Sequence, residues 1–197
     1  MSHFPSGWFY IQSKCSHKMV LDVTQDSLKA AAKVIVWPKK TKDNDNQLWM
    51  YDHGYIINKN SGMGKYMTGK QFSVIKYKKV LDVQGGVIES DKQIIQYRRK
   101  MVEDAHNQRW NYRDDGFIYL QANPNLVLDI RGNWTKPGTV VLLYERKYKD
   151  NLNQLWDLIP YESVSDQSSV LSPSIQSQGT EVNDDDDYAF SSASYAL

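Results

Sequence analysis

The chain has 197 residues, with 24 Lys and Arg against 23 Asp and Glu, a single Cys and 41% hydrophobic residues. This length and composition fit one folded domain with an appendage, and no apolar run of about 18 residues predicts a transmembrane helix. One Cys cannot form an internal disulfide, and the first residues lack the basic and apolar regions of a signal peptide. We therefore expect a cytoplasmic protein without membrane insertion; export by a route that needs no signal peptide stays open.

Four short blocks recur in the same order three times along residues 7–161. The first block begins with Gly and continues with aromatic and aliphatic residues, at 7–12, 54–58 and 116–121. The second is apolar around one Asp, at 19–23, 79–83 and 126–130. The third ends in Trp or Tyr, at 34–37, 94–97 and 141–144, and the fourth reads Asn-Gln-x-Trp, at 46–49, 107–110 and 153–156. The order and spacing of these blocks indicate a threefold internal repeat.

Each block is short, rich in β-branched and aromatic residues and bounded by turn residues, which predicts a strand. Four strands in each of three repeats predict an all-β fold of twelve strands. A threefold array of this kind can close a barrel and remove exposed strand edges, so we expect a β-trefoil whose last block pairs with its first. We assign the trefoil to residues 1–161, with repeats at about 7–53, 54–115 and 116–161.

The middle repeat is longer than the others, because its spacing from Gly to Asp is 28 residues against 15 and 13. The excess predicts an insertion at about 62–77. One interpretation is a specificity loop beside a binding site, since surface loops of a rigid scaffold tolerate insertions. The alternative is a translated intron, because the tripeptide at 64–66, Gly-Lys-Tyr, can be encoded by a splice-donor sequence.

The charges are divided unevenly along the chain. Residues 1–161 carry 24 basic and 16 acidic side chains, whereas residues 162–197 carry seven acidic side chains, ten Ser and no Lys or Arg. Such a polar segment cannot bury enough apolar surface to offset the entropy of ordering it. We therefore expect residues 162–197 to form a disordered tail, which either keeps the protein soluble or docks on the basic body of the protein or on a partner.

The three Gln-x-Trp motifs, with Leu-Asp upstream of each, resemble those of the ricin B-type (R-type) lectin family over residues 7–161. The resemblance implies a non-catalytic, carbohydrate-binding lectin for galactose or N-acetylgalactosamine, with up to three shallow pockets. In this family an Asp, an aromatic platform and an Asn face the sugar, and a Gln supports the Asp. The corresponding residues here are Asp22, Trp37, Asn46 and Gln47; Asp82, Tyr97, Asn107 and Gln108; and Asp129, Tyr144, Asn153 and Gln154.

These residue types suit a sugar ligand. An aromatic ring can contact the apolar face of a pyranose, a carboxylate can accept hydrogen bonds from adjacent hydroxyls, and amides can donate and accept. The spacing favours binding at the first and third repeats over the middle one, where the distance from Asp to Asn is one residue longer and the insertion lies upstream. Some family sites carry a polar residue two positions before the platform, where this chain has Ile35, Ile95 and Leu142. The closing residues Trp49, Trp110 and Trp156 are expected in the core.

No catalytic motif or metal-ligand spacing is present, so we expect neither an enzyme nor a cofactor or metal. The expected partners are clustered glycans, bound by avidity, rather than nucleic acid. Three alternatives stay open: a ricin-like toxin component, a trefoil that binds protein through loops such as 62–77, and a basic face that binds anionic polymers. The basic face would comprise Lys39, Lys40, Lys42, Arg98, Arg99 and Lys100.

Overall fold

The computed structural model describes residues 4–16, 18–62, 65–68, 71–74 and 79–162. The predicted tail, from residue 163 onward, lies outside the described residues, and so does part of the predicted insertion. Two strands are described within the insertion, β6 (Lys65–Thr68) and β7 (Gln71–Val74), and they pair antiparallel as a sheet of their own.

The remaining strands belong to the three repeats and form one connected sheet. The first repeat contains β1 (Phe9–Ser13), β2 (Met19–Val23), β3 (Val34–Pro38) and β4 (Trp49–Asp52). The second contains β5 (Tyr55–Asn58), β8 (Lys79–Val83), β9 (Lys92–Arg98) and β10 (Trp110–Tyr112). The third contains β11 (Ile118–Leu120), β12 (Asn123–Ile130), β13 (Val141–Glu145) and β14 (Trp156–Pro160). This arrangement confirms the predicted all-β class and twelve-stranded β-trefoil.

Helical structure among the described residues is limited to single turns. One is the α-helical turn α1 (Lys59–Gly62). The others are the 3-10 turns η1 (Thr24–Asp26), η2 (Asp45–Gln47), η3 (Gln84–Gly86), η4 (Val102–Asp104), η5 (Arg131–Asn133) and η6 (Leu152–Gln154).

The first and last strands of the repeats close a six-stranded barrel. As predicted, β14 pairs with β1 along its whole length, so the end of the trefoil meets its beginning. Strand β4 pairs with β5, and β10 pairs with β11. The remaining joints are the pair Phe9–Trp49 and the backbone hydrogen bonds from Trp110 N to Gly54 O (2.7 Å) and from Trp156 N to Gly116 O (2.9 Å).

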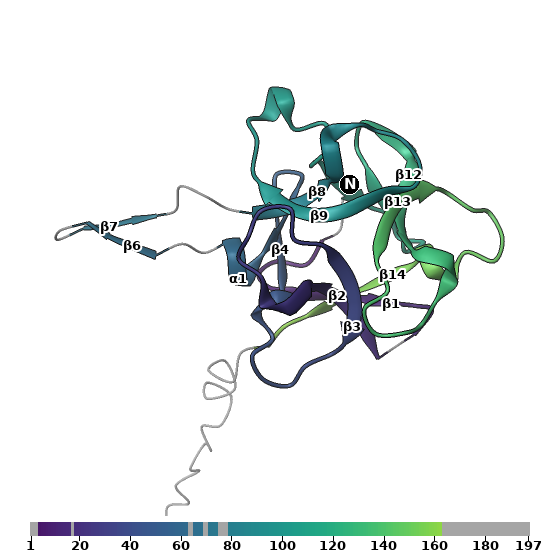
Figure 1. The fold of residues 1–197 in the computed structure, drawn as a ribbon, viewed down its shortest axis with the longest axis horizontal. Coiled ribbons are helices and arrows are strands. Elements are labelled where there is room, and N and C mark those ends of the chain that lie inside the picture. The colour runs from purple at the N-terminus through teal and green to yellow at the C-terminus, as the bar shows by residue number, and fades with distance from the viewer. Residues whose placement is uncertain (1–3, 17, 63–64, 69–70, 75–78, 163–197) are drawn as a thin grey trace, which may run out of the picture. The chain divides into compact units, whose positions relative to one another are not determined.

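The middle strands of each repeat form a hairpin: β2–β3, β8–β9 and β12–β13. In Figure 1 the three hairpins, coloured from purple through teal to green, lie around a common centre. They also contact one another, because β13 pairs with β9 and isolated bridges join Lys33 to Ile95 and Ile35 to Val140. Each hairpin is therefore fixed by its neighbours as well as by its own repeat.

The three closing Trp residues are fully buried. Each indole N–H also donates a hydrogen bond to a backbone carbonyl of its own repeat, so the ring carries no unpaired polar group into the core. The pairs are Trp49 with Leu21 O (3.1 Å), Trp110 with Leu81 O (3.0 Å) and Trp156 with Leu128 O (3.2 Å).

The register corrects one detail of the repeat alignment. In the barrel, the closing Trp of one repeat pairs with Ser13, Asn58 or Leu120 of the next. These three partners are therefore equivalent positions. The residues four positions before them are Phe9, Gly54 and Gly116, so the equivalent of the two glycines is Phe9 and not Gly7. The first repeat therefore begins two residues later than its glycine suggests, and its spacing to Asp22 equals that of the third repeat.

The same register locates the insertion. Gln12 pairs with Val20 and Tyr119 pairs with Val127, and seven residues separate each pair. The equivalent pair in the middle repeat is Ile57 with Val80, separated by 22 residues. The chain thus returns to the same strand position after 15 additional residues.

Candidate functional site

Each hairpin carries one of the predicted Asp residues beside an aromatic ring. In the first hairpin, Asp22 pairs with Ile35 and Val20 pairs with Trp37. Because alternate residues of a strand point to the same face, this register puts the side chains of Asp22 and Trp37 on one face of the hairpin. The other hairpins repeat the register with Asp82 and Tyr97 and with Asp129 and Tyr144.

The Asp and the platform differ sharply in exposure. All three Asp residues are only 3% exposed. The platforms are the open residues, at 41% for Trp37, 40% for Tyr97 and 37% for Tyr144. Each site therefore offers a buried carboxylate next to a solvent-facing ring.

The Gln of each Gln-x-Trp motif ties the Asp to the segment that follows the platform. Gln108 Nε2 donates to Asp82 Oδ2 (2.7 Å) and to Arg98 O (2.9 Å), while its Oε1 accepts from Lys100 N (2.8 Å). The other repeats have the same three bonds, with 2.9 Å from Gln47 to Asp22 and 2.8 Å from Gln154 to Asp129. The Gln is thus a buried structural link that also orients the carboxylate.

The predicted Asn residues lie against the same carboxylates. Asn107 Nδ2 donates to Asp82 Oδ2 (3.0 Å), and Asn153 Nδ2 donates to Asp129 Oδ2 (2.9 Å). In the first repeat, Asn46 Nδ2 donates to the carbonyl of Val23 (2.9 Å). The Oδ1 atoms of Asp82 and Asp129 receive no hydrogen bond from the part of the chain that the structure describes, so they keep full accepting capacity.

Burial raises the pKa of these carboxyl groups. The pKa of Asp22 and of Asp82 rises to about 6, and that of Asp129 rises as well. Desolvation is the main cause, and it is opposed in each repeat by the hydrogen bond from the Gln and by a nearby Lys ammonium. At neutral pH Asp22 and Asp82 are largely ionised, but only because this polar shell offsets part of the cost of burial.

A lysine in every pocket was missed as a site residue in the sequence analysis. Its ammonium donates to the side-chain oxygen of the predicted Asn, so it lies beside the predicted site residues. The three pairs are Lys40 with Asn46 (3.0 Å), Lys100 with Asn107 (2.8 Å) and Lys147 with Asn153 (3.4 Å). The signal was present, because a Lys follows each platform by three residues. The sequence places Lys40 and Lys100 only in the alternative basic face.

The middle pocket brings its predicted residues together despite the longer spacing from Asp to Asn. A cavity of about 450 Å³ brings together Asp82, Tyr97, Lys100 and Asn107, with Ile95 also lining it. The extra residue is absorbed in the turn, since η4 ends before Asn107 whereas η2 and η6 include their Asn. The hydrogen bonds to Asp82 are therefore kept.

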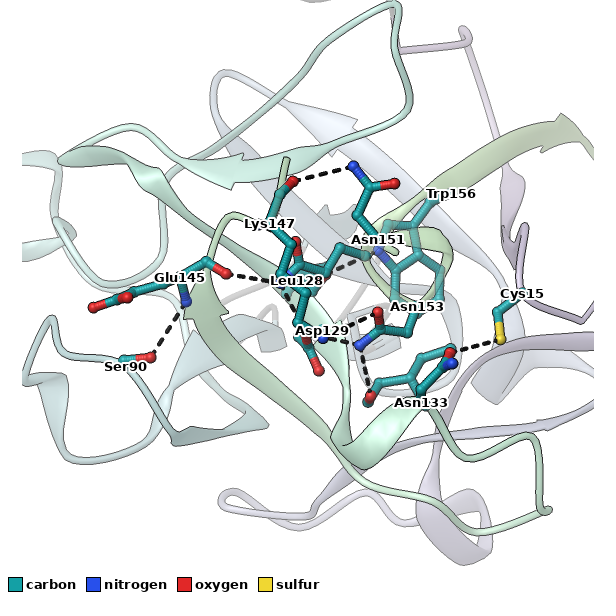
Figure 2. A network of polar contacts seen from close by, with 12 residues as sticks. Cys15, Ser90, Leu128, Asp129, Asn133, Glu145, Lys147, Asn151, Asn153 and Trp156 are labelled. Atoms are coloured by element: carbon teal, nitrogen blue, oxygen red, sulfur yellow. Dashed lines mark hydrogen bonds and ion pairs between the residues drawn. The ribbon is translucent and has the colours of Figure 1, made fainter. Parts of the chain in front are cut away.

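Each pocket is completed by a loop from another repeat. Ala31 of the first repeat lines the middle cavity. A Cβ built on Gly138 of the third repeat would lie 3.8 Å from the ring of Trp37. Ser90 Oγ of the second repeat accepts a hydrogen bond from Glu145 N (3.2 Å), next to the third platform (Figure 2). The pockets thus depend on the closed trefoil.

Figure 2 shows the third site, where Lys147, Asn153 and Asp129 converge near the core residue Trp156. Lys147 Nζ lies 3.9 Å from Asp129 Oδ2. At the side of this cluster Asn133 accepts a hydrogen bond from Cys15 Sγ (3.1 Å), which links the third repeat to the first.

Two further findings concern the described residues only. They contain no group of three or more His, Cys, Asp and Glu side chains that could hold a metal ion. Within the same ranges, no helix has the length and apolar composition needed to cross a membrane.

Comparisons with known proteins agree with this geometry. No protein-family model matches the chain. Mucoricin from Rhizopus delemar is 42% identical over 116 residues, which cover 59% of this chain and 67% of mucoricin. The solution structure of the mdaA-1 domain superposes with a TM-score of 0.66 and 28% identity, covering 81% of this chain and 93% of that domain.

The fold is also that of a solved lectin domain. The C-terminal half of the earthworm R-type lectin, in complex with GalNAc, gives a TM-score of 0.59 at 21% identity, covering 79% of this chain and 98% of that domain. Three Gln-x-Trp repeats, a closed β-trefoil and the identity to mucoricin lead to one conclusion: this chain belongs to the ricin B-type (R-type) lectin family.

Proposed function

We propose that this protein is a lectin that binds galactose-type sugars through its three hairpin pockets without chemical conversion. The observation that carries the proposal is the threefold recurrence of a buried, hydrogen-bonded carboxylate beside an exposed aromatic ring. A purely structural acid would not need an open platform and an amide next to it in every repeat.

The geometry suggests how a sugar is held. The apolar C–H face of a pyranose covers the ring of Trp37, Tyr97 or Tyr144. Two adjacent hydroxyls donate to the Asp, whose Oδ1 in the second and third pockets accepts no hydrogen bond from the described residues. The Lys ammonium donates to the sugar oxygens, and the Asn amide can exchange its intramolecular contacts for sugar contacts.

Galactose and N-acetylgalactosamine fit this arrangement because their O3 and O4 hydroxyls form an adjacent pair beside an apolar face. The earthworm lectin domain, which shares the fold, is described in complex with GalNAc. Each shallow pocket binds weakly by itself, but three pockets on one trefoil can engage clustered glycans with a much higher effective affinity.

The test is a calorimetric titration of the full chain with galactose, N-acetylgalactosamine and glucose. We expect saturable binding of the first two, weaker binding of glucose, and loss of binding in the triple variant Asp22→Asn, Asp82→Asn, Asp129→Asn. Asp157→Asn is the matched control, since it removes an acid that pairs with Lys14 (3.3 Å) away from the predicted site residues. Equal binding by the triple variant and the control would overturn the proposal.

The identity to mucoricin favours a second candidate, a component of a ricin-like toxin. In that function the same pockets would attach the protein to glycans on a target cell. Toxicity of the purified chain to cultured cells, lost in the triple variant and kept in the Asp157→Asn control, would support it; a non-toxic chain that still binds galactose would leave the lectin function alone.

A further inference from the structure

Among the differences between the three pockets, one lies four residues after each Asp. This position is Asp26 in the first repeat, Gly86 in the second and Asn133 in the third. All three have positive φ, at 51°, 76° and 59°. Gly, Asn and Asp are the residues that best tolerate this left-handed conformation, so the position can change its chemistry while the backbone stays the same.

The residue at this position decides whether the pocket lysine is neutralised. In the first pocket, Lys40 Nζ forms an ion pair with Asp26 Oδ1 (2.7 Å). In the middle pocket the corresponding residue is Gly86, and a Cβ there would lie 3.7 Å from Lys100 Nζ. A side chain at residue 86 would therefore reach the ammonium, but glycine supplies none.

The positive charge of Lys40 is therefore compensated by the carboxylate of Asp26, whereas that of Lys100 is not compensated at this position. Its ammonium donates to the neutral side chain of Asn107 (2.8 Å). No carboxylate among the described residues lies within ion-pair distance of it; Asp82 influences it only from farther away. In the third pocket Lys147 Nζ is 3.9 Å from Asp129, and Asn133 is engaged by Cys15.

The middle pocket also has room on that side. Gly85 and Gly86 line the cavity of about 450 Å³ together with Lys100. An ammonium that faces an open cavity and lacks a carboxylate partner favours an anionic group on the ligand, because a charge-assisted hydrogen bond is stronger than a neutral one. In the first pocket the carboxylate of Asp26 would repel such a group.

We propose that the middle pocket selects galactose-type sugars that carry a carboxylate or a sulfate, an inference that rests on the proposed lectin function. Gly86 is then the position that determines this specificity. The first pocket, with Asp26 on its lysine, selects neutral sugars. One chain would then recognise glycans that present neutral and acidic galactose units together.

The test isolates the middle pocket in the double variant Asp22→Asn, Asp129→Asn and measures the Kd of galactose, galacturonate and galactose 6-sulfate. We expect at least one anionic sugar to bind about fivefold more tightly than galactose, as one partly exposed charge pair allows, with the preference decreasing in high salt. Adding Gly86→Asp, which copies the first repeat, should abolish the preference. Gly86→Asn, which copies the third repeat, is the matched control and should keep it.

The outcomes separate this inference from the function on which it rests. Absence of galactose binding by both the double variant and the unmodified chain contradicts the lectin function. Galactose binding without an anionic preference, or with a preference that survives Gly86→Asp, overturns the inference alone. If the double variant does not fold, the amide signals of Gly85 and Gly86 in the nuclear magnetic resonance spectrum of the unmodified chain give the same comparison. The concentration of galacturonate needed to shift these signals should be lower than the concentration of galactose. If galactose shifts them at the lower concentration, the inference is overturned.

Discussion

Gln108 donates a hydrogen bond of 2.7 Å to Asp82, and both side chains are almost completely buried, at 0% and 3% exposure. A buried carboxylate opposes folding unless its charge is compensated. The same pair recurs in the other repeats. The folded trefoil would therefore be more stable if these three side chains were neutral. The proposed sugar binding gives a reason for keeping them charged.

Replacing Asp82 with Asn should stabilise the fold at neutral pH while it removes sugar binding from the middle pocket. The folded pKa of about 6 lies above the ordinary Asp value of 3.8, so stability is lost as pH rises through this interval, and Asn avoids that loss. We expect a gain of about 1–3 kcal/mol in the free energy of unfolding at pH 7. At pH 3 the gain should nearly vanish, because Asp82 is then largely protonated in both states. Urea unfolding at the two pH values measures it; a loss of stability at pH 7 would contradict this explanation.

Sugar affinity should decrease in mild acid. An ionised carboxylate accepts two hydroxyl hydrogen bonds, whereas a protonated one loses part of this capacity. With the pKa of Asp22 and Asp82 at about 6, about a tenth of each carboxyl is ionised at pH 5, so galactose should bind up to about tenfold more weakly than at pH 7.5. Calorimetry across this range tests the expectation, and an affinity that stays constant down to pH 5 would show that these carboxylates do not receive the sugar.

Gln108→Leu should destabilise the protein in addition to weakening the middle pocket. The change leaves Asp82 Oδ2, Arg98 O and Lys100 N without the amide that connects them. Unpaired buried polar groups make this cost about 2–4 kcal/mol. Thermal unfolding measures it. The result should resemble that of Gln47→Leu and Gln154→Leu, and a neutral effect at all three positions would contradict a structural role for the Gln.

Deleting residues 64–78 should leave the fold and sugar binding intact. The deletion leaves seven residues between Ile57 and Val80, the number found between Gln12 and Val20 and between Tyr119 and Val127. Shortening the loop from 22 to seven residues should stabilise the chain by about 1 kcal/mol through lower closure entropy. Unfolding of the shortened chain would show that the insertion is structurally required. Sequencing the transcript tests the intron hypothesis separately, and a mature message that contains the segment rejects it.

The sequence predicted the trefoil well because its determinants are local and repeated. Strand composition, turn residues and the Trp at the end of each repeat occur three times, and the β1–β14 pairing follows from closure of the barrel. The Asp, platform, Asn and Gln positions could be transferred because their spacings are nearly constant. The structure brings each set together at one hairpin.

Other features depend on contacts that one repeat does not encode. The wall that Ala31 contributes to the middle cavity comes from another repeat, so spacing within a repeat cannot reveal it. The starting register failed because Gly7 precedes the true equivalent, Phe9, by two residues. Lys100 was not predicted as a site residue because lysines are common on protein surfaces, so its recurring position three residues after the platform was a weak signal; in the structure its hydrogen bond to Asn107 distinguishes it.

A crystal structure of the full chain grown with galactose tests the central claim most directly. The proposal predicts a pyranose on the ring of Trp37, Tyr97 or Tyr144, with two adjacent hydroxyls within hydrogen-bond distance of the Asp in the same pocket and the Lys ammonium on a sugar oxygen. Galactose bound elsewhere on the trefoil, or three empty pockets at a galactose concentration that saturates binding in solution, would contradict it.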